Sequence, residues 1–141
     1  MITRNADATW TGDLKAGKGT VNLGSGAFSG PYSFSSRFEG QKAANPEELL
    51  GAAHAACFTM ALASTLAKAG HVATSVHTVA AVTLAKGDAG FSITGIHLKT
   101  EGKVPGVSAA DFRKHAEDTK TGCIVSRALA SVPMTVEATL L

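Results

Sequence analysis

The segment NPEELLGAAHAACFTMALASTLAKAG, residues 45–70, decides the fold of this 141-residue chain. It opens with Asn45, a preferred N-cap residue, and continues with Pro46 at the first helical position. The carboxylate of Glu48 is spaced to reach back to the amide of the cap. Gly70 is typical of the residue at which a helix ends. The pattern therefore predicts one long helix over residues 45–70.

The apolar residues of this helix do not form a single stripe. Leu50, Cys57 and Met60 lie on one side, whereas Phe58 and Leu66 lie on another. A helix that is apolar nearly all round is buried on more than one side. Its many Ala and Gly residues leave room for other backbone, from a sheet or from a second copy of the chain. The segment is too weakly hydrophobic for a bilayer span, so we expect no membrane partner.

The remaining sequence predicts strands and two further helices around this central helix. Glycine-broken stretches within about 1–40 are typical of a small meander of strands. Alternating residues over 72–103, interrupted by a glycine-rich turn and with Gly95 as a candidate bulge, predict a long hairpin. Residues 108–141 predict two helices, the first capped by Ser108, and a last strand after Pro133. This order indicates an α+β fold with an antiparallel sheet, in one domain over 1–141.

Composition excludes several classes of protein. Hydrophobic residues make up 45% of the chain and charged residues 17%, which is ordinary for a globular domain. The net charge of +2 involves no run of basic residues, so we expect no nucleic-acid partner. Two cysteines and no apolar leader favour a cytoplasmic protein. The histidines and cysteines show no ligand spacing, so we expect no metal site.

The two cysteines, Cys57 and Cys123, stand in different settings. Cys123 follows a glycine at the start of a short helix, where backbone amides and the helix dipole favour a thiolate. Cys57 lies about three turns inside the long helix, so a cation from elsewhere would have to activate it. The pair is open to three interpretations: inert core residues, a structural bridge, or a peroxidatic and resolving couple.

Two motifs are similar to those of a known family. The segment from Asn45 to Leu62, with Cys57 at its centre, and the later Gly122-Cys123-Ile124-Val125-Ser126-Arg127-Ala128-Leu129 closely resemble the OsmC/Ohr family of thiol-dependent peroxidases. The stretch Ser36-Arg37-Phe38-Glu39-Gly40 resembles the OsmC branch. The similarity in element order extends over essentially the whole chain.

The resemblance implies a role for each of four residues. Cys57 would be the peroxidatic thiol and Cys123 the resolving thiol, while Arg37 would activate Cys57 and hold the peroxide, with Glu47 as its carboxylate partner. The implied enzyme reduces organic hydroperoxides in preference to hydrogen peroxide, in defence against oxidative or osmotic stress. It passes through a sulfenic acid and an intramolecular disulfide, which an external dithiol, for example of the lipoyl type, reduces without a cofactor. The implied fold is OsmC-like, with a buried central helix in an intertwined homodimer.

Helix geometry sharpens the assignment of Glu47. Ten residues of helix separate Glu47 from Cys57, a rise of about 15 Å, so Glu47 cannot touch the thiol of its own chain. Either Arg37 spans much of this gap or Glu47 serves the partner subunit, and we favour the second. Glu48 is better interpreted as a capping residue, and His54 as a packing residue rather than the base for Cys57.

Two other classes of function remain open. The same cysteine couple could act in a non-catalytic redox sensor or binding module, or both thiols could be inert. A sensor would stop after one equivalent of peroxide, whereas an enzyme would turn over.

Overall fold

The computed structural model describes residues 1–141. The contacts within the chain separate it into two units, Met1–Leu49 and Leu50–Leu141, and each is described by itself. The expectation of a single domain stays a prediction.

The first unit contains the expected meander. The strands β1 (Ala6–Thr11), β2 (Lys18–Leu23) and β3 (Ser29–Tyr32) form an antiparallel sheet in the order β1-β2-β3. The turn after β1 passes through Gly12, whose φ of 93° lies in the region that favours glycine. The Nε1–H of Trp10 donates to the Gly12 carbonyl at 3.1 Å and so closes this turn.

A short helix, α1 (Phe34–Phe38), follows β3 and was not expected. The Ser33 hydroxyl accepts from the Ser36 N–H at 3.0 Å, while the Ser36 hydroxyl oxygen accepts from the Ser33 N–H at 2.9 Å. This reciprocal pair is a capping box. It places Arg37 in the last turn of α1 rather than on a strand.

The long helix α2 (Pro46–Lys68) begins where the sequence predicted. Asn45 Oδ1 accepts from the backbone N–H of Glu48 at 2.8 Å, which is the predicted N-cap bond, whereas the expected second bond from the Asn45 N–H to the Glu48 carboxylate is not formed. At the other end, Gly70 has a φ of 89°, and the His71 N–H donates to the Leu66 carbonyl at 2.9 Å. The helix therefore ends at Lys68, and Gly70 turns the chain away from it, as the sequence predicted.

The second unit contains the sheet β4-β5-β6, made of β4 (Ser75–Gly87), β5 (Gly90–Lys103) and β6 (Met134–Leu140). The predicted hairpin is the antiparallel pair β4 and β5, and its register shifts between Thr83 and Leu84, opposite Gly95. One detail of the expected antiparallel sheet is wrong, because β6 pairs with β5 in parallel. Two helices lie between these strands, and such a crossover returns the chain in the same direction.

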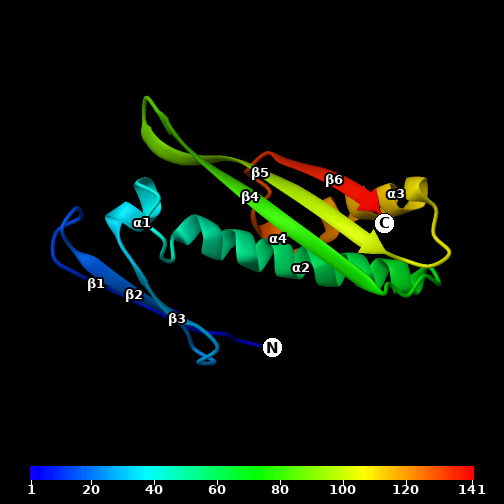
Figure 1. The fold of residues 1–141 in the computed structure, drawn as a ribbon, viewed down its shortest axis with the longest axis horizontal. Helices are drawn as coiled ribbons and strands as arrows, with labels where there is room; N and C mark the ends of the chain where they lie inside the picture. Colours follow the sequence, from blue (N-terminus) through cyan, green and yellow to red (C-terminus); the bar gives the residue numbers. More distant parts are fainter. The chain divides into compact units, whose positions relative to one another are not determined.

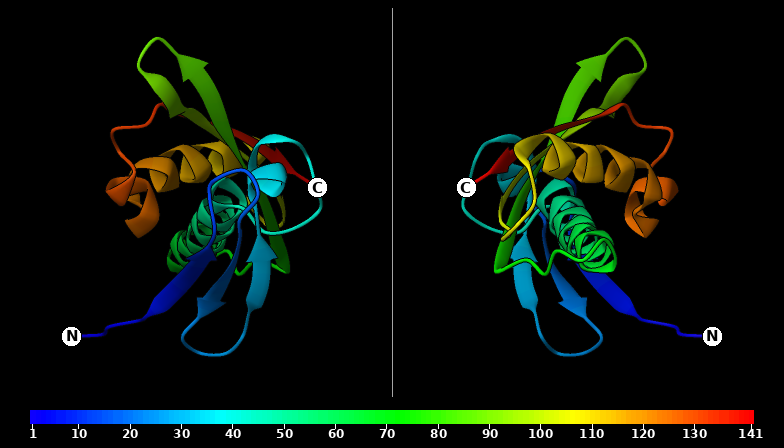
Figure 2. Two further views of the ribbon diagram at one scale, coloured as in Figure 1. Left: turned by 90° about the vertical axis from the view of Figure 1, so that its left-hand side faces the viewer. Right: turned by 90° about the vertical axis from the view of Figure 1, so that its right-hand side faces the viewer.

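The helices α3 (Ala109–Gly122) and α4 (Ile124–Ala128) make this crossover. Ser108 caps α3 as predicted, accepting from the Asp111 N–H at 3.1 Å. Figures 1 and 2 show α2 and α3 on the same face of the sheet. The core between them draws on both helices and on β5, and it consists of Phe58, Leu62, Leu66, Ile96, Leu98, Val104, Phe112, Ala116 and Cys123.

Within this single chain, α2 is buried along one stripe rather than on several sides. The buried positions recur every three or four residues: Gly51, His54, Phe58, Leu62 and Leu66. Met60, which was expected in the core, is 74% exposed because it lies on the opposite face. Glycine does allow the close approach expected of this helix, since a Cβ at Gly51 would lie 3.0 Å from the Ala80 carbonyl oxygen of β4.

The expectation that this segment is too weakly hydrophobic for a bilayer span is wrong by length and composition alone, because α2 has a mean hydropathy of 1.5 and is long enough to cross a membrane. The core helix of a soluble protein has the same properties. Its buried stripe packs in the core of the second unit, which is what a core helix does.

Candidate functional site

The two thiols meet in the core of the second unit. Cys57 lies on α2 and is half-buried, whereas Cys123 is 1% exposed. Their sulfur atoms are 3.0 Å apart and share a hydrogen bond, and neither is in a disulfide. The fold therefore brings together two residues that are 66 positions apart in the sequence.

Cys123 is the junction of two helices. It is the C-cap of α3, where its N–H donates to the Thr119 carbonyl at 2.9 Å. It is also the N-cap of α4, where its carbonyl accepts from the Arg127 N–H at 3.0 Å. The sequence placed Cys123 in the first turn of this second helix; in the structure it stands one position before it.

The environment separates the acidities of the two thiols. Burial raises the pKa of the Cys57 thiol, and the hydrogen bond with Cys123 raises it further. Burial acts in the same sense on Cys123, but hydrogen bonds from Cys57, from the backbone and hydroxyl of Ser126 and from the Val125 N–H outweigh it and lower the pKa of Cys123. Of the two thiols, Cys123 is therefore in the environment that favours the thiolate more.

His54 lies on α2, three residues before Cys57, and is wholly buried. Its Nε2 is 2.7 Å from the hydroxyl oxygen of Ser126, and its Nδ1 has no hydrogen-bond partner. Burial lowers the pKa of His54, so the ring is neutral at physiological pH. No hydrogen bond joins His54 to Cys57, and its partner is Ser126.

In the first unit, Arg37 and Glu47 form a two-pronged ion pair. The Arg37 Nη2 lies 2.7 Å from Glu47 Oε1, and its Nε lies 3.2 and 3.3 Å from the two carboxylate oxygens. Fork-shaped pairs of this kind fix the plane of the guanidinium. Arg37 comes from α1 and Glu47 from the first turn of α2, so the ion pair ties these two helices together.

One aromatic ring contacts the Arg37 guanidinium, and others line a cavity beside it. The guanidinium lies over the Phe38 ring at 5.3 Å from the centroid. A cavity of about 240 Å³ opens beside it, with Trp10, Tyr32 and Phe34 in its walls. A polar molecule with an apolar body could place its polar end on Arg37 and its apolar part on these rings.

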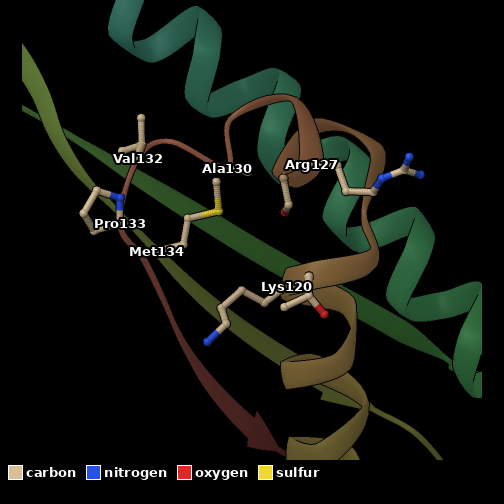
Figure 3. Close-up of a pocket in the computed structure, with 8 residues that line it drawn as sticks. Lys120, Arg127, Ala130, Val132, Pro133 and Met134 are labelled. Atoms are coloured by element: carbon tan, nitrogen blue, oxygen red, sulfur yellow. The ribbon is translucent and has the colours of Figure 1, made fainter.

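A second hollow, of about 520 Å³, lies in the second unit between α3, α4 and the start of β6 (Figure 3). Lys120 reaches toward it, whereas Arg127 points away from it (Figure 3). Neither cysteine lines this hollow. Although this hollow is larger than the cavity beside Arg37, it is not the site of the thiol chemistry, because neither thiol faces it.

The structure contains no group of three or more His, Cys, Asp and Glu side chains that could hold a metal ion. His97, for instance, bonds to the Thr135 hydroxyl on the neighbouring strand at 2.7 Å. The side chains that are brought together are thiols, an ion pair and a buried histidine.

Sequence reasoning missed two parts of these sites. The first is Ser126, whose role depends on a contact with His54 across 72 positions, for which the sequence carries no local signal. The second is the aromatic wall beside Arg37, since Trp10 and Phe34 belong to different elements. The serines at positions 33 and 36, spaced as in a capping box, could have revealed α1.

Comparison with known proteins gives a consistent result. Residues 39–137 match the family of OsmC-like proteins. The chain is 53% identical over 129 residues to Peroxiredoxin OsmC of Escherichia coli strain K12, an alignment that covers 91% of this chain and 90% of that protein. Peroxiredoxin OsmC of Shigella flexneri matches to the same extent.

Solved structures agree on the fold. The organic hydroperoxide resistance protein of Elizabethkingia anophelis has a TM-score of 0.73 at 24% identity and covers 99% of this chain and 96% of its own. The organic hydroperoxide resistance protein OhrB of Bacillus subtilis has a TM-score of 0.73 at 22% identity, covering 97% and 98%. At such identities these likenesses show the fold alone, whereas the family match and the 53% identity decide the family. The chain belongs to the OsmC family and is a peroxiredoxin-like peroxidase.

Proposed function

We propose that this protein reduces organic hydroperoxides with Cys57 as the peroxidatic thiol and Cys123 as the resolving thiol. The observation that carries the proposal is the 3.0 Å contact between the two sulfur atoms. A sulfenic acid formed on either sulfur has a thiol within reach, which is the requirement for an intramolecular disulfide. The pair is also closed off from solvent on the side of Cys123, which is 1% exposed.

The first step is attack of the Cys57 thiolate on the distal peroxide oxygen. The O–O bond breaks, Cys57 becomes a sulfenic acid, and the departing alkoxide takes up a proton to leave as an alcohol. Because the local environment raises the pKa of Cys57, this step needs a cation. We assign that role to Arg37, held by Glu47.

The second step forms the disulfide. The Cys123 thiolate attacks the sulfur of the Cys57 sulfenic acid, and hydroxide leaves with a proton as water. The lowered pKa of Cys123 suits this role, since the attacking group must be a thiolate. An external dithiol then reduces the disulfide, becoming a disulfide itself and restoring both thiols.

The proposed preference for organic hydroperoxides over hydrogen peroxide is supported by the cavity beside Arg37. Its aromatic walls suit an alkyl or aryl group, and hydrogen peroxide has neither. We expect replacement of Phe34 by Ala to raise KM for cumene hydroperoxide and to leave turnover of hydrogen peroxide nearly unchanged.

We further propose that the active protein is a homodimer in which Arg37 and Glu47 of one chain serve the thiols of its partner. Two observations support this arrangement. The 2.7 Å ion pair keeps Arg37 beside Glu47, and Glu47 is separated from Cys57 by about 15 Å of helix. In addition, α2 exposes an apolar face that includes Met60, which a second copy would cover.

Mixed dimers test the shared site. One chain carries Cys57→Ser and the other carries Arg37→Ala, so that neither homodimer is active. If the residues act across the interface, the mixed dimer has one complete site and recovers about half of the wild-type activity. If they act within one chain, the mixed dimer stays inactive.

The chemistry is tested by the mass of the protein after one equivalent of cumene hydroperoxide. The wild type is expected to lose two hydrogens, and Cys123→Ser to gain one oxygen. Gain of one oxygen by Cys57→Ser instead would assign the attack to Cys123. Repeated turnover with a dithiol distinguishes an enzyme from a sensor, which stops after one equivalent. A cytoplasmic location, where the thiols return to the reduced state, stays a prediction.

A further inference from the structure

Ser36 carries a buried hydroxyl on the short helix α1, directly before Arg37. It is 5% exposed, whereas the Arg37 side chain is 39% exposed. The Ser36 hydroxyl oxygen accepts from the Ser33 N–H at 2.9 Å, which is one half of the capping box of α1. Two carbonyl oxygens lie within reach of the hydroxyl proton, that of Ser33 at 3.0 Å and that of Ala44 at 2.8 Å. The chemistry proposed above does not use this residue.

The Ser36 hydroxyl donates to the Ala44 carbonyl. A hydroxyl has one proton to donate, and the contact with Ala44 is the shorter of the two. The Ser33 carbonyl already accepts from the Arg37 N–H at 3.2 Å. The Ser36 side chain therefore caps α1 and also joins this helix to the segment that leads into α2 (Figure 1).

Ala44 is held by the elements on either side of α1. Its N–H donates to the Pro31 carbonyl of β3 at 3.0 Å, and it forms an isolated parallel bridge with Tyr32. The next residue, Asn45, caps α2. A helix of five residues is not stable alone, so its contacts with such fixed points determine where it lies. The bond from Ser36 to Ala44 is therefore a bond from α1 to the frame made by β3 and the start of α2.

The orientation of Ser36 sets the orientation of Arg37. Successive side chains on a helix point about 100° apart, so a fixed Ser36 also fixes the direction in which Arg37 leaves α1. Arg37 then meets Glu47 in the first turn of α2 at 2.7 Å. A partly exposed ion pair contributes little by itself to holding the backbone, because water and salt screen it. The hydrogen bond of Ser36 is shielded from water and does not have this weakness.

We propose that Ser36 is a positioning residue for the ion pair of Arg37 and Glu47. Its hydroxyl holds α1 on Ala44, so that the guanidinium stays on the Glu47 carboxylate in the orientation from which it serves the peroxide step. Ser36 acts through Arg37 and takes no part in proton transfer. The inference rests on the proposed function for the role of Arg37, and it adds the residue that keeps Arg37 in place.

Steady-state kinetics test the effect on activity. Ser36→Ala is expected to lower kcat/KM for cumene hydroperoxide about fivefold, because the loss of one hydrogen bond lowers the population of the positioned arrangement by about that factor. The kcat/KM for the dithiol, which reports reduction of the disulfide, should be unchanged. Equal losses in the two constants would indicate general damage to the protein and would contradict the proposal.

Two variants separate positioning from helix capping. Ser33→Ala removes the other half of the capping box and the Ser33 contact with Gln41, but it leaves the bond from Ser36 to Ala44. It should therefore lower kcat/KM for the hydroperoxide less than Ser36→Ala does, and an equal loss would mean that only the cap matters. Ser36→Thr keeps the hydroxyl and should restore the wild-type value. A Ser36→Thr protein that is folded by circular dichroism and behaves like Ser36→Ala would contradict a role for the hydroxyl.

A second measurement does not depend on peroxidase function. In proton–nitrogen correlation NMR spectra, the signal of the Arg37 Nε–H is identified by its loss in Arg37→Lys. This N–H lies 3.2 Å from Glu47 Oε1, so it should exchange slowly with water in the wild type. It should exchange about fivefold faster in Ser36→Ala, and faster also in Glu47→Gln, the positive control.

The NMR result separates failure of this inference from failure of the proposed function. An unchanged exchange rate of the Arg37 Nε–H in folded Ser36→Ala would overturn the positioning role. Faster exchange in Ser36→Ala, together with an unchanged kcat/KM in Arg37→Ala, would show that Ser36 positions the ion pair and that the role proposed for Arg37 in the peroxide step is wrong.

Discussion

Oxidation of the cysteine pair should stabilise the folded protein by about 4 kcal/mol. The two thiols are 66 residues apart in the sequence, so a disulfide between them closes a large loop in the unfolded chain. The chain-entropy relation gives a loss of about 15 cal/mol/K for such a loop, or about 4 kcal/mol at 25 °C. Since the thiols already touch within a packed core, little rearrangement of the folded state offsets this gain.

The effect is large enough to measure in several ways. For a chain of this length, 1 kcal/mol moves the melting temperature by about 3 °C, so oxidation should raise it by roughly 12 °C. Urea unfolding of the protein treated with one equivalent of hydroperoxide, compared with the dithiol-reduced protein at the same chain concentration, gives the difference directly. The double variant Cys57→Ser/Cys123→Ser is the matched control, and the same treatment should leave its midpoint unchanged. An oxidised wild type no more stable than the reduced protein would refute the reasoning.

Three further changes have definite expected outcomes. Glu47→Gln keeps the shape of the side chain but loses the charge that holds Arg37, so kcat/KM should fall about tenfold; the free energy of unfolding should change by less than about 1 kcal/mol, because the Arg37 side chain is 39% exposed. Phe58→Ala empties a fully buried position and should lower the free energy of unfolding by about 3–5 kcal/mol in urea titrations. His54 has a lowered pKa in the folded state, so below about pH 6.5 the unfolded chain binds a proton that the folded chain does not. Stability should therefore fall as pH falls through that window, by up to about 1.4 kcal/mol per pH unit, and His54→Gln should lose this part of the dependence.

Each of these predictions has a matched control on the same chain. Glu48→Gln removes a neighbouring carboxylate that does not bind Arg37, and an equal loss of activity would contradict the role of Glu47. Val72→Ala changes an exposed position and should change the free energy of unfolding little. If Phe58→Ala lowered the free energy of unfolding no more than Val72→Ala does, burial of Phe58 would not stabilise the core. His77→Gln changes an exposed histidine, and an equal change in the pH dependence there would show that burial of His54 is not the cause.

Local signals in the sequence predicted most of the second unit and much of the first. The cap at Asn45, the glycine at position 70 and the hairpin with its bulge at Gly95 all depend on neighbouring residues, and the structure has each of them. The direction of β6 was not predictable in the same way, because it depends on the path of two helices across the sheet rather than on the strand's own residues.

The site residues were likewise predictable where a local motif marks them and not where a long-range contact does. The family motifs pointed to the two cysteines, to Arg37 and to Glu47, and the structure joins them pairwise. Ser126 could not be singled out, since its contact with His54 exists only after folding. Met60 was predicted in the core but is exposed within the single chain. The sequence of a helix shows that a position is apolar, but it does not show whether the same chain or a second copy covers that position.

Because Cys123 lies between two helices, its oxidation would restrain the backbone of both helices as well as change the chemistry of the thiols. One residue ends α3 and begins α4, and its backbone is bonded to both. A covalent link from its sulfur to α2 would anchor the joint of two helices to a third. Amide hydrogen exchange at the end of α3 and through α4 should then be slower in the oxidised protein than in the reduced protein. The exchange rate of these helices would therefore report whether the protein has reacted with a peroxide.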